Sequence, residues 1–217
     1  MLHGTDDEGN KIKRPYTPIS RIDETGMIQF VIKVYKPTSR FPKGGQMSQF
    51  LEKLKVGESL YISGPVGKHK YLGNGRFYSI RDKKLKFVKK ITFIAGGTGI
   101  TPFYQILQHI NDNKEKEKNN LKVKLLFANK SSKDILLRKE LTQMAEKGLI
   151  DDLKFCLDKA DEENWTGFEG YVEKDMLDGF LWENTRDHVV IMCGPPMMCD
   201  GIVDALEELK YENYIQY

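Results

Sequence analysis

A stretch near the start of the chain carries residue types that can hold a phosphate and a flat ring. RPYTPIS at residues 14–20 combines a fixed cation, a phenol, a hydroxyl and two prolines. The arginine can grip a phosphate with two parallel hydrogen bonds, and the tyrosine can pack against a ring. The alternative is an edge strand whose prolines block pairing and whose Arg14 and Tyr16 are ordinary surface residues.

Glycine turns enter helical patterns at two places. KGGQMSQ at residues 43–49 runs into a short helix, whose free N–H groups can take a pyrophosphate. AGGTGITP at residues 95–102 lies between an apolar strand and an amphipathic helix. A plain helix entry also explains the first turn. Strand–helix packing also explains the second, which departs from the GxGxxG dinucleotide fingerprint.

The pattern of secondary structure changes near residue 85. Before it, β-rich runs and one short helix predict an antiparallel sheet or barrel. After it, strands alternate with helices, which predicts a doubly wound parallel sheet whose ligands lie at the carboxyl ends of the strands. We therefore predict domains at residues 1–85 and 86–217. The predicted strands are 27–35, 57–63, 91–95, 123–129, 153–157 and 189–193; the helices are 47–55, 101–111, 136–147, 173–181 and 197–209; a charged loop spans 113–120.

Composition argues against several classes of protein. Lys and Arg number 34 against 31 Asp and Glu, a net charge of +3 that is too small to indicate nucleic-acid binding. Three cysteines without CxxC spacing argue against a disulfide framework and a zinc site, and we predict no metal. Without a long apolar run or a signal peptide, we expect a soluble, cytoplasmic monomer. Attachment to the cytosolic face of a membrane is left open.

The order of the motifs resembles the NADH–cytochrome b5 reductase family, within the ferredoxin reductase type of flavoprotein. The resemblance runs from residue 13 to the C-terminus and is specific in combination. The motifs that carry it are RPYTPIS, VIKVY (31–35), GGQMSQ (44–49), GPVG (64–67), AGGTGITP, LLFAN (125–129), DILLR (134–138) and CGPP (193–196).

The resemblance implies an antiparallel β-barrel that binds FAD, followed by an α/β domain that binds NAD, with FAD in the cleft between them. Arg14 would hold the FAD pyrophosphate, Tyr16 would pack beside the flavin, and Thr17 would hydrogen-bond near its redox nitrogens. The other residues implied at FAD or on the flavin–NADH side are Pro15, Ile32, Lys33, Tyr35, Gly45, Gln46, Met47 and Ser48.

On the NADH side, Thr98 and Thr101 would lie at the flavin–nicotinamide junction, and Cys193 would orient the nicotinamide ring without a covalent bond. Asp158 matches an acid near the adenosine ribose, which accepts from a 2′-hydroxyl and repels a 2′-phosphate, favouring NADH over NADPH. The alternatives are a small core residue for Cys193 and a solvated loop acid for Asp158. The remaining implied residues are Gly97, Gly99, Pro102, Asn129, Gly194 and Pro195; Thr17, Thr98 and Cys193 are the predicted catalytic set.

The implied activity is hydride transfer from NADH to FAD, followed by single-electron transfer to a haem protein such as cytochrome b5. Lys83 and Lys84 would meet an acidic face of that acceptor, although Gln46 replaces a lysine that close relatives often carry. Two alternatives remain: the reductase module of a larger enzyme such as nitrate reductase, and a non-catalytic binding protein.

The start of the chain departs from the family pattern. Relatives carry further barrel strands before the arginine motif, whereas residues 1–13 precede it here. A barrel without those strands exposes unpaired edges. We therefore expect an N-terminally incomplete FAD domain and weak flavin retention by this chain alone.

Overall fold

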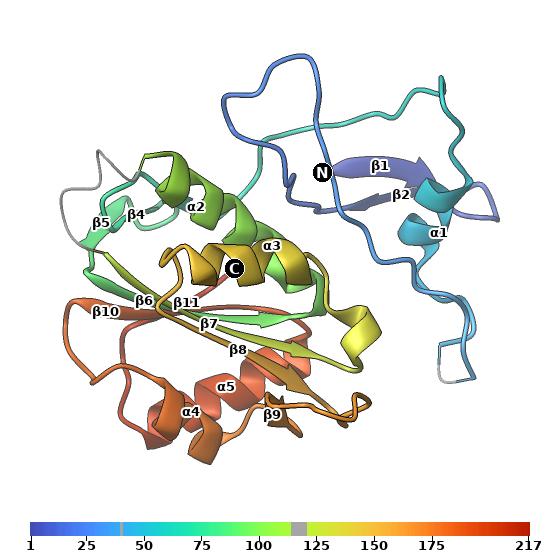
Figure 1. Ribbon diagram of the computed structural model, residues 1–217. Helices are drawn as coiled ribbons and strands as arrows, with labels where there is room; N and C mark the ends of the chain where they lie inside the picture. Colours follow the sequence, from blue (N-terminus) through green and yellow to red (C-terminus); the bar gives the residue numbers. More distant parts are fainter. Residues whose placement is uncertain (40, 114–120) are drawn as a thin grey trace.

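The second part of the chain forms a six-stranded parallel sheet, seen in the computed structural model (Figure 1). The structure describes residues 1–39, 41–113 and 121–217. The strand order is β11–β10–β6–β7–β8–β9, and neighbouring strands pair in parallel. The strands are β6 (Lys90–Gly96), β7 (Lys122–Asn129), β8 (Asp152–Leu157), β9 (Phe168–Glu169), β10 (His188–Cys193) and β11 (Tyr214–Gln216).

Helices cover both faces of this sheet. The core on one face includes side chains from α2 (Ile100–Asp112) and α3 (Arg138–Glu146). The core on the other face includes side chains from α4 (Lys174–Phe180) and α5 (Pro196–Glu208). Along β6, Phe93 joins the first core and Ile94 the second, because successive strand side chains point to opposite faces. The predicted doubly wound arrangement is confirmed.

The first part of the chain holds few strands, and they pair antiparallel. Strand β1 (Leu2–Thr5) pairs with β2 (Lys11–Arg14), and α1 (Gln46–Lys53) contacts both. Strands β3 (His69–Tyr71), β4 (Arg76–Ser79) and β5 (Lys84–Phe87) form a three-stranded sheet. A long loop connects β2 to α1 in Figure 1.

The strands predicted at residues 27–35 and 57–63 are wrong. Their β-branched and aromatic residues favour extended backbone, but a strand also needs a neighbour that supplies a ladder of hydrogen bonds. In the described residues these runs make isolated contacts instead of ladders. The Ile19 N–H donates to the Gln29 carbonyl at 2.8 Å, and Leu2 forms a single bridge with Ile62. Residue propensity therefore overpredicts sheet in this part.

Other differences from the predicted elements are local. Helix α3 begins at Arg138 because Leu137 adopts a left-handed backbone, with φ of 56°. Strands β9 and β11 were not predicted, since two or three residues are too few to show a period. Apart from Asn113, the predicted charged loop at 113–120 lies outside the described residues. Within the described ranges, no helix is both long and apolar enough to cross a membrane.

A buried histidine begins strand β10. His188 is 1% exposed, and its Nε2 lies 2.9 Å from the Thr92 hydroxyl oxygen on β6. The Tyr211 ring packs edge-on against the imidazole at 5.7 Å between centroids. Burial lowers the pKa of His188 to about 4, because charging the ring would cost solvation energy. The imidazole is therefore neutral near pH 7.

Candidate functional site

One large cleft is lined by residues from both parts of the chain. Its volume is about 2360 Å³, more than twice the roughly 1,000 Å³ that bounds most single-ligand pockets. It therefore has room for more than one ligand. The predicted site residues on its wall are Pro15, Tyr16, Thr17, Lys33, Tyr35, Gly45, Gly97, Thr98, Gly99, Thr101, Pro102, Asn129, Asp158, Cys193, Gly194 and Pro195.

The glycine turn after β6 reaches this cleft as a single 3-10 turn, η1 (Gly97–Gly99). Gly97 has a φ of 53°, which favours glycine. A Cβ on Gly99 would lie 2.0 Å from the Cys193 carbonyl oxygen, so only glycine allows η1 to approach the end of β10 this closely. The Thr101 hydroxyl donates to the Thr98 carbonyl at 3.1 Å and holds the start of α2 against the turn.

Cys193 ends β10, where its backbone pairs with Ala95 on β6. Burial raises the pKa of the Cys193 thiol to about 11, so the sulfur is protonated near pH 7. A protonated thiol is a poor nucleophile. The site chemistry therefore suits a thiol that shapes the cleft and forms no covalent bond.

Asn129 ends β7, and Asp158 directly follows the end of β8. Asn129 is 6% exposed and lies on the cleft wall, yet its side-chain oxygen and nitrogen have no hydrogen-bond partner among the described residues. The Asp158 N–H donates to the Asn129 carbonyl at 3.0 Å, so the two residues are held together. Since buried polar groups are normally paired, the free amide fits a polar ligand such as a nicotinamide dinucleotide.

Aromatic residues from the first part of the chain line the same cleft. The pKa of Tyr16 is raised mainly by burial and to a smaller extent by the nearby Tyr35 phenol. Its hydroxyl therefore remains neutral near pH 7 and keeps its proton for hydrogen bonding. Two phenols and the Thr17 hydroxyl form a polar, aromatic wall that suits a flavin ring.

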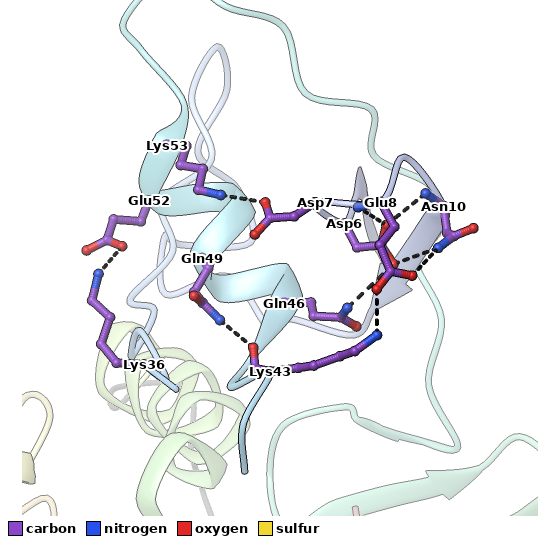
Figure 2. A network of polar contacts seen from close by, with 10 residues as sticks. All are labelled: Asp6, Asp7, Glu8, Asn10, Lys36, Lys43, Gln46, Gln49, Glu52 and Lys53. Carbon is purple, nitrogen blue, oxygen red and sulfur yellow. Dashed lines mark hydrogen bonds and ion pairs between the residues drawn. The ribbon is translucent and has the colours of Figure 1, made fainter. Parts of the chain in front are cut away.

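The glycine turn before α1 leaves the helix N-terminus without a side-chain cap. Figure 2 shows the polar contacts that surround this helix. The Ser48 hydroxyl accepts from the Tyr35 N–H at 3.0 Å and donates to the Gly45 carbonyl at 2.8 Å. Because that hydroxyl is occupied, a pyrophosphate here would be held by backbone N–H groups of the first turn. The Gln46 amide instead reaches toward Asp6, at 3.4 Å.

Five predicted site residues do not line the cleft: Arg14, Ile32, Gln46, Met47 and Ser48. Arg14 is exposed, and its guanidinium donates to the neighbouring Lys13 carbonyl at 2.8 Å. Met47 is buried in the core. Their cofactor contacts remain predictions.

Tyr171 lies on the cleft wall and was not predicted as a site residue. It is 75% exposed and follows Gly170, whose φ is 97°. In the sequence, a residue that follows the end of a parallel strand is a candidate site residue, and Tyr171 follows β9 after one glycine. Because β9 has only two residues, the sequence does not reveal that a strand ends there.

Comparison with known proteins identifies the two parts of the chain. Residues 1–71 match the oxidoreductase FAD-binding domain family, and residues 93–204 match the oxidoreductase NAD-binding domain family. NADH-cytochrome b5 reductase 2 of Gallus gallus is 39% identical over 218 residues, covering 95% of this chain and 70% of its own. The chain belongs to the NADH-cytochrome b5 reductase family. The predicted family and fold class are confirmed, as is the prediction that one part binds FAD and the other NAD. The predicted domain bounds remain predictions.

Several proteins that this chain resembles extend well beyond the matched region. NADH-cytochrome b5 reductase 3 of Mus musculus is 41% identical over 88% of this chain, which spans 64% of that relative's length. Nitrate reductase of Betula pendula is 37% identical over 92% of this chain, and the match covers 22% of that enzyme. The cytochrome b5 reductase domain of Ulva prolifera nitrate reductase has a TM-score of 0.89 and 30% identity, covering this whole chain and 82% of its own.

Proposed function

We propose that this chain is an FAD-dependent oxidoreductase that takes a hydride from NADH and passes single electrons to a haem protein such as cytochrome b5. The observation that carries the proposal is the shared cleft, which is lined by a part that matches FAD-binding domains and a part that matches NAD-binding domains. Hydride transfer between two cofactors requires them to lie against each other.

The two cofactors would supply the redox chemistry, and the chain's own residues would bind, orient and exclude water. Tyr16 and Thr17 would hold the flavin side, with backbone N–H groups at the start of α1 for its pyrophosphate. Thr98 on η1 and Cys193 on β10 would form the floor for the nicotinamide. Contact between that floor and its ligand would fix the orientation of the nicotinamide, and proximity with orientation can supply roughly 7–11 kcal/mol of a reaction barrier.

The electron acceptor would dock on the turn between β4 and β5. Lys83 in this turn and Lys84 at the start of β5 are both exposed, and a pair of cations favours a partner with an acidic face. We propose that the chain works as a monomer in the cytoplasm, with attachment to the cytosolic face of a membrane left open. Its similarity to nitrate reductases supports a second candidate, the reductase module of a larger enzyme.

An absorbance spectrum tests the proposed activity. The protein, supplied with FAD, is expected to show a flavin band that bleaches when one equivalent of NADH is added anaerobically. The band should return when two or more equivalents of oxidised cytochrome b5 are added, because each haem accepts one electron. A colourless protein that takes up no FAD would instead support a non-catalytic binding role. The length of the native gene separates a free reductase from a module of a larger enzyme.

Replacing the acid at the end of β8 is expected to change nucleotide preference. Asp158→Ser removes a carboxylate that would repel the 2′-phosphate of NADPH, so the ratio of kcat/KM for NADPH over NADH should rise about tenfold or more. Steady-state kinetics with both nucleotides measures the ratio. Asp161→Ser is the matched control, because this neighbouring acid accepts from the Ser132 N–H away from the cleft. Equal ratios in wild type and Asp158→Ser would contradict the assignment.

A further inference from the structure

An ion pair joins the two parts of the chain beside the cleft. The Lys33 ammonium nitrogen lies 2.6 Å from Asp134 Oδ1, and each side chain is 26% exposed. Lys33 lines the cleft, whereas Asp134 is not among the lining residues and lies on the short 3-10 turn η2 (Ser132–Asp134) after β7. The contact therefore reaches from the NAD-binding part to a cation on the cleft wall.

We propose that Asp134 is a positioning residue, which holds the Lys33 ammonium in the cleft so that it faces the anionic part of the nicotinamide dinucleotide. This inference rests on the proposed function, because it assumes that the cleft takes NADH.

Contacts other than the one with Lys33 hold Asp134 in place. The Ser131 hydroxyl donates to Asp134 Oδ2 at 2.9 Å, which leaves Oδ1 for the lysine. The next residue, Ile135, is buried in the core that includes side chains of α2 and α3. Burial alone would raise the pKa of Asp134, but hydrogen bonds from Lys33 and Ser131, and the charges of Lys33 and Lys130, leave it below its usual value. The carboxylate is thus a fixed anion near pH 7.

Within the FAD-binding part, Lys33 also contacts Tyr35, two residues along the chain. Its ammonium nitrogen lies 5.7 Å from the centre of the Tyr35 ring. The Tyr35 backbone accepts from the Gly45 N–H at 2.8 Å and donates to the Ser48 hydroxyl at 3.0 Å. A continuous set of contacts therefore runs from η2 through residues 33 and 35 to the start of α1.

The Lys33–Asp134 pair is better explained by its effect on the position of the lysine charge than by a contribution to folding stability. Partly exposed ion pairs contribute little to folding, because water screens them and long side chains lose freedom. A free lysine samples many rotamers, whereas a lysine held by a rigid acid presents its charge at one place. Such a charge acts on the binding of an anion more than on the folding of the chain.

The chain offers a matched control for this test. Arg21 Nη1 lies 3.0 Å from Asp112 Oδ1, a second ion pair between the same two parts. Neither residue lines the cleft. Asp134→Asn and Asp112→Asn therefore remove the same charge and the same kind of contact, but only the first loosens a cation that faces the cleft.

The experiment compares these variants in the FAD-loaded protein. Asp134→Asn is expected to raise KM for NADH about fivefold and to weaken binding of NAD⁺, measured by calorimetry, by a similar factor. Its kcat with ferricyanide, a small acceptor, should stay within about twofold of wild type. Asp112→Asn should change neither value. Thermal melting confirms that both variants fold.

Three results would overturn the inference. One is an unchanged KM and NAD⁺ affinity in Asp134→Asn; another is an equal change in Asp112→Asn, which would indicate general coupling of the two parts. The third comes from Lys33→Gln: if Asp134→Asn weakens NAD⁺ binding as much in that background as in wild type, Asp134 does not act through the lysine. A wild-type protein that binds no NAD⁺ contradicts the proposed function itself, and the inference with it.

Discussion

Gly99→Ala is expected to lower the rate of flavin reduction by NADH about 100-fold, because misplacement of a site by roughly 1 Å has effects of that size. The new Cβ would lie 2.0 Å from the Cys193 carbonyl oxygen and 2.5 Å from its carbon. Both contacts are backbone, so no side chain can move aside. Either η1 or the end of β10 must shift, and both form the predicted nicotinamide floor.

The same substitution should also lower stability. Overpacking costs about 1–3 kcal/mol in unfolding free energy. Rapid-mixing kinetics of flavin bleaching measures the first effect, and urea unfolding measures the second. Gly179→Ala is the control, because its added Cβ in α4 meets no atom within 4 Å. Wild-type reduction kinetics in Gly99→Ala would show that the close approach of η1 to β10 is not needed for function.

The second large effect concerns stability against acid. His188 has a pKa of about 4 in the folded protein, against an ordinary value of 6.5. Between these values the unfolded chain binds the proton and the folded chain does not, so protonation favours unfolding. The stabilising contribution is complete above pH 6.5 and falls as the pH drops toward 4. The loss reaches about 3 kcal/mol of unfolding free energy.

Urea unfolding at several pH values between these limits measures this loss. Carboxylates also titrate toward the acid end, so the informative quantity is the difference between wild type and His188→Gln. His188→Gln loses the contact with Thr92, so its unfolding free energy near pH 7 should be lower than that of wild type. Between pH 6.5 and 4.5, however, its unfolding free energy should fall less than that of wild type. Parallel pH curves for the two proteins would contradict a buried neutral imidazole.

The parallel sheet was predictable because its strands and helices each have a recognisable pattern of apolar residues. The run 189–193 is apolar throughout, and 91–95 is apolar except for Thr92, as expected of strands that are covered on both faces. The helices between them carry apolar residues that recur about every 3.6 positions, which marks one buried face. The first part of the chain was less predictable, because a run such as 27–35 becomes a strand only when a neighbour pairs with it, and the residues of the run do not reveal that neighbour.

The site was predictable where it depends on strand ends and glycine turns. Asn129, Asp158 and Cys193 all end up on the cleft wall, because carboxyl ends of parallel strands meet at one edge. The Lys33–Asp134 pair was not predictable, since 101 positions separate its members. Many lysines and acids in the chain fit such a pair equally well by residue type. Only the fold selects these two.

The order of the strands has a consequence for how this architecture diverges. Strand β6 has β7 on one side and β10 on the other, and the helices that follow β6 and β10 pack on opposite faces of the sheet. A crevice opens where the direction of winding reverses, so the backbone path determines its location. Substitutions along its walls would change which molecule it holds and leave it in the same place. Descendants of one such chain can therefore acquire new partners while their architecture stays constant.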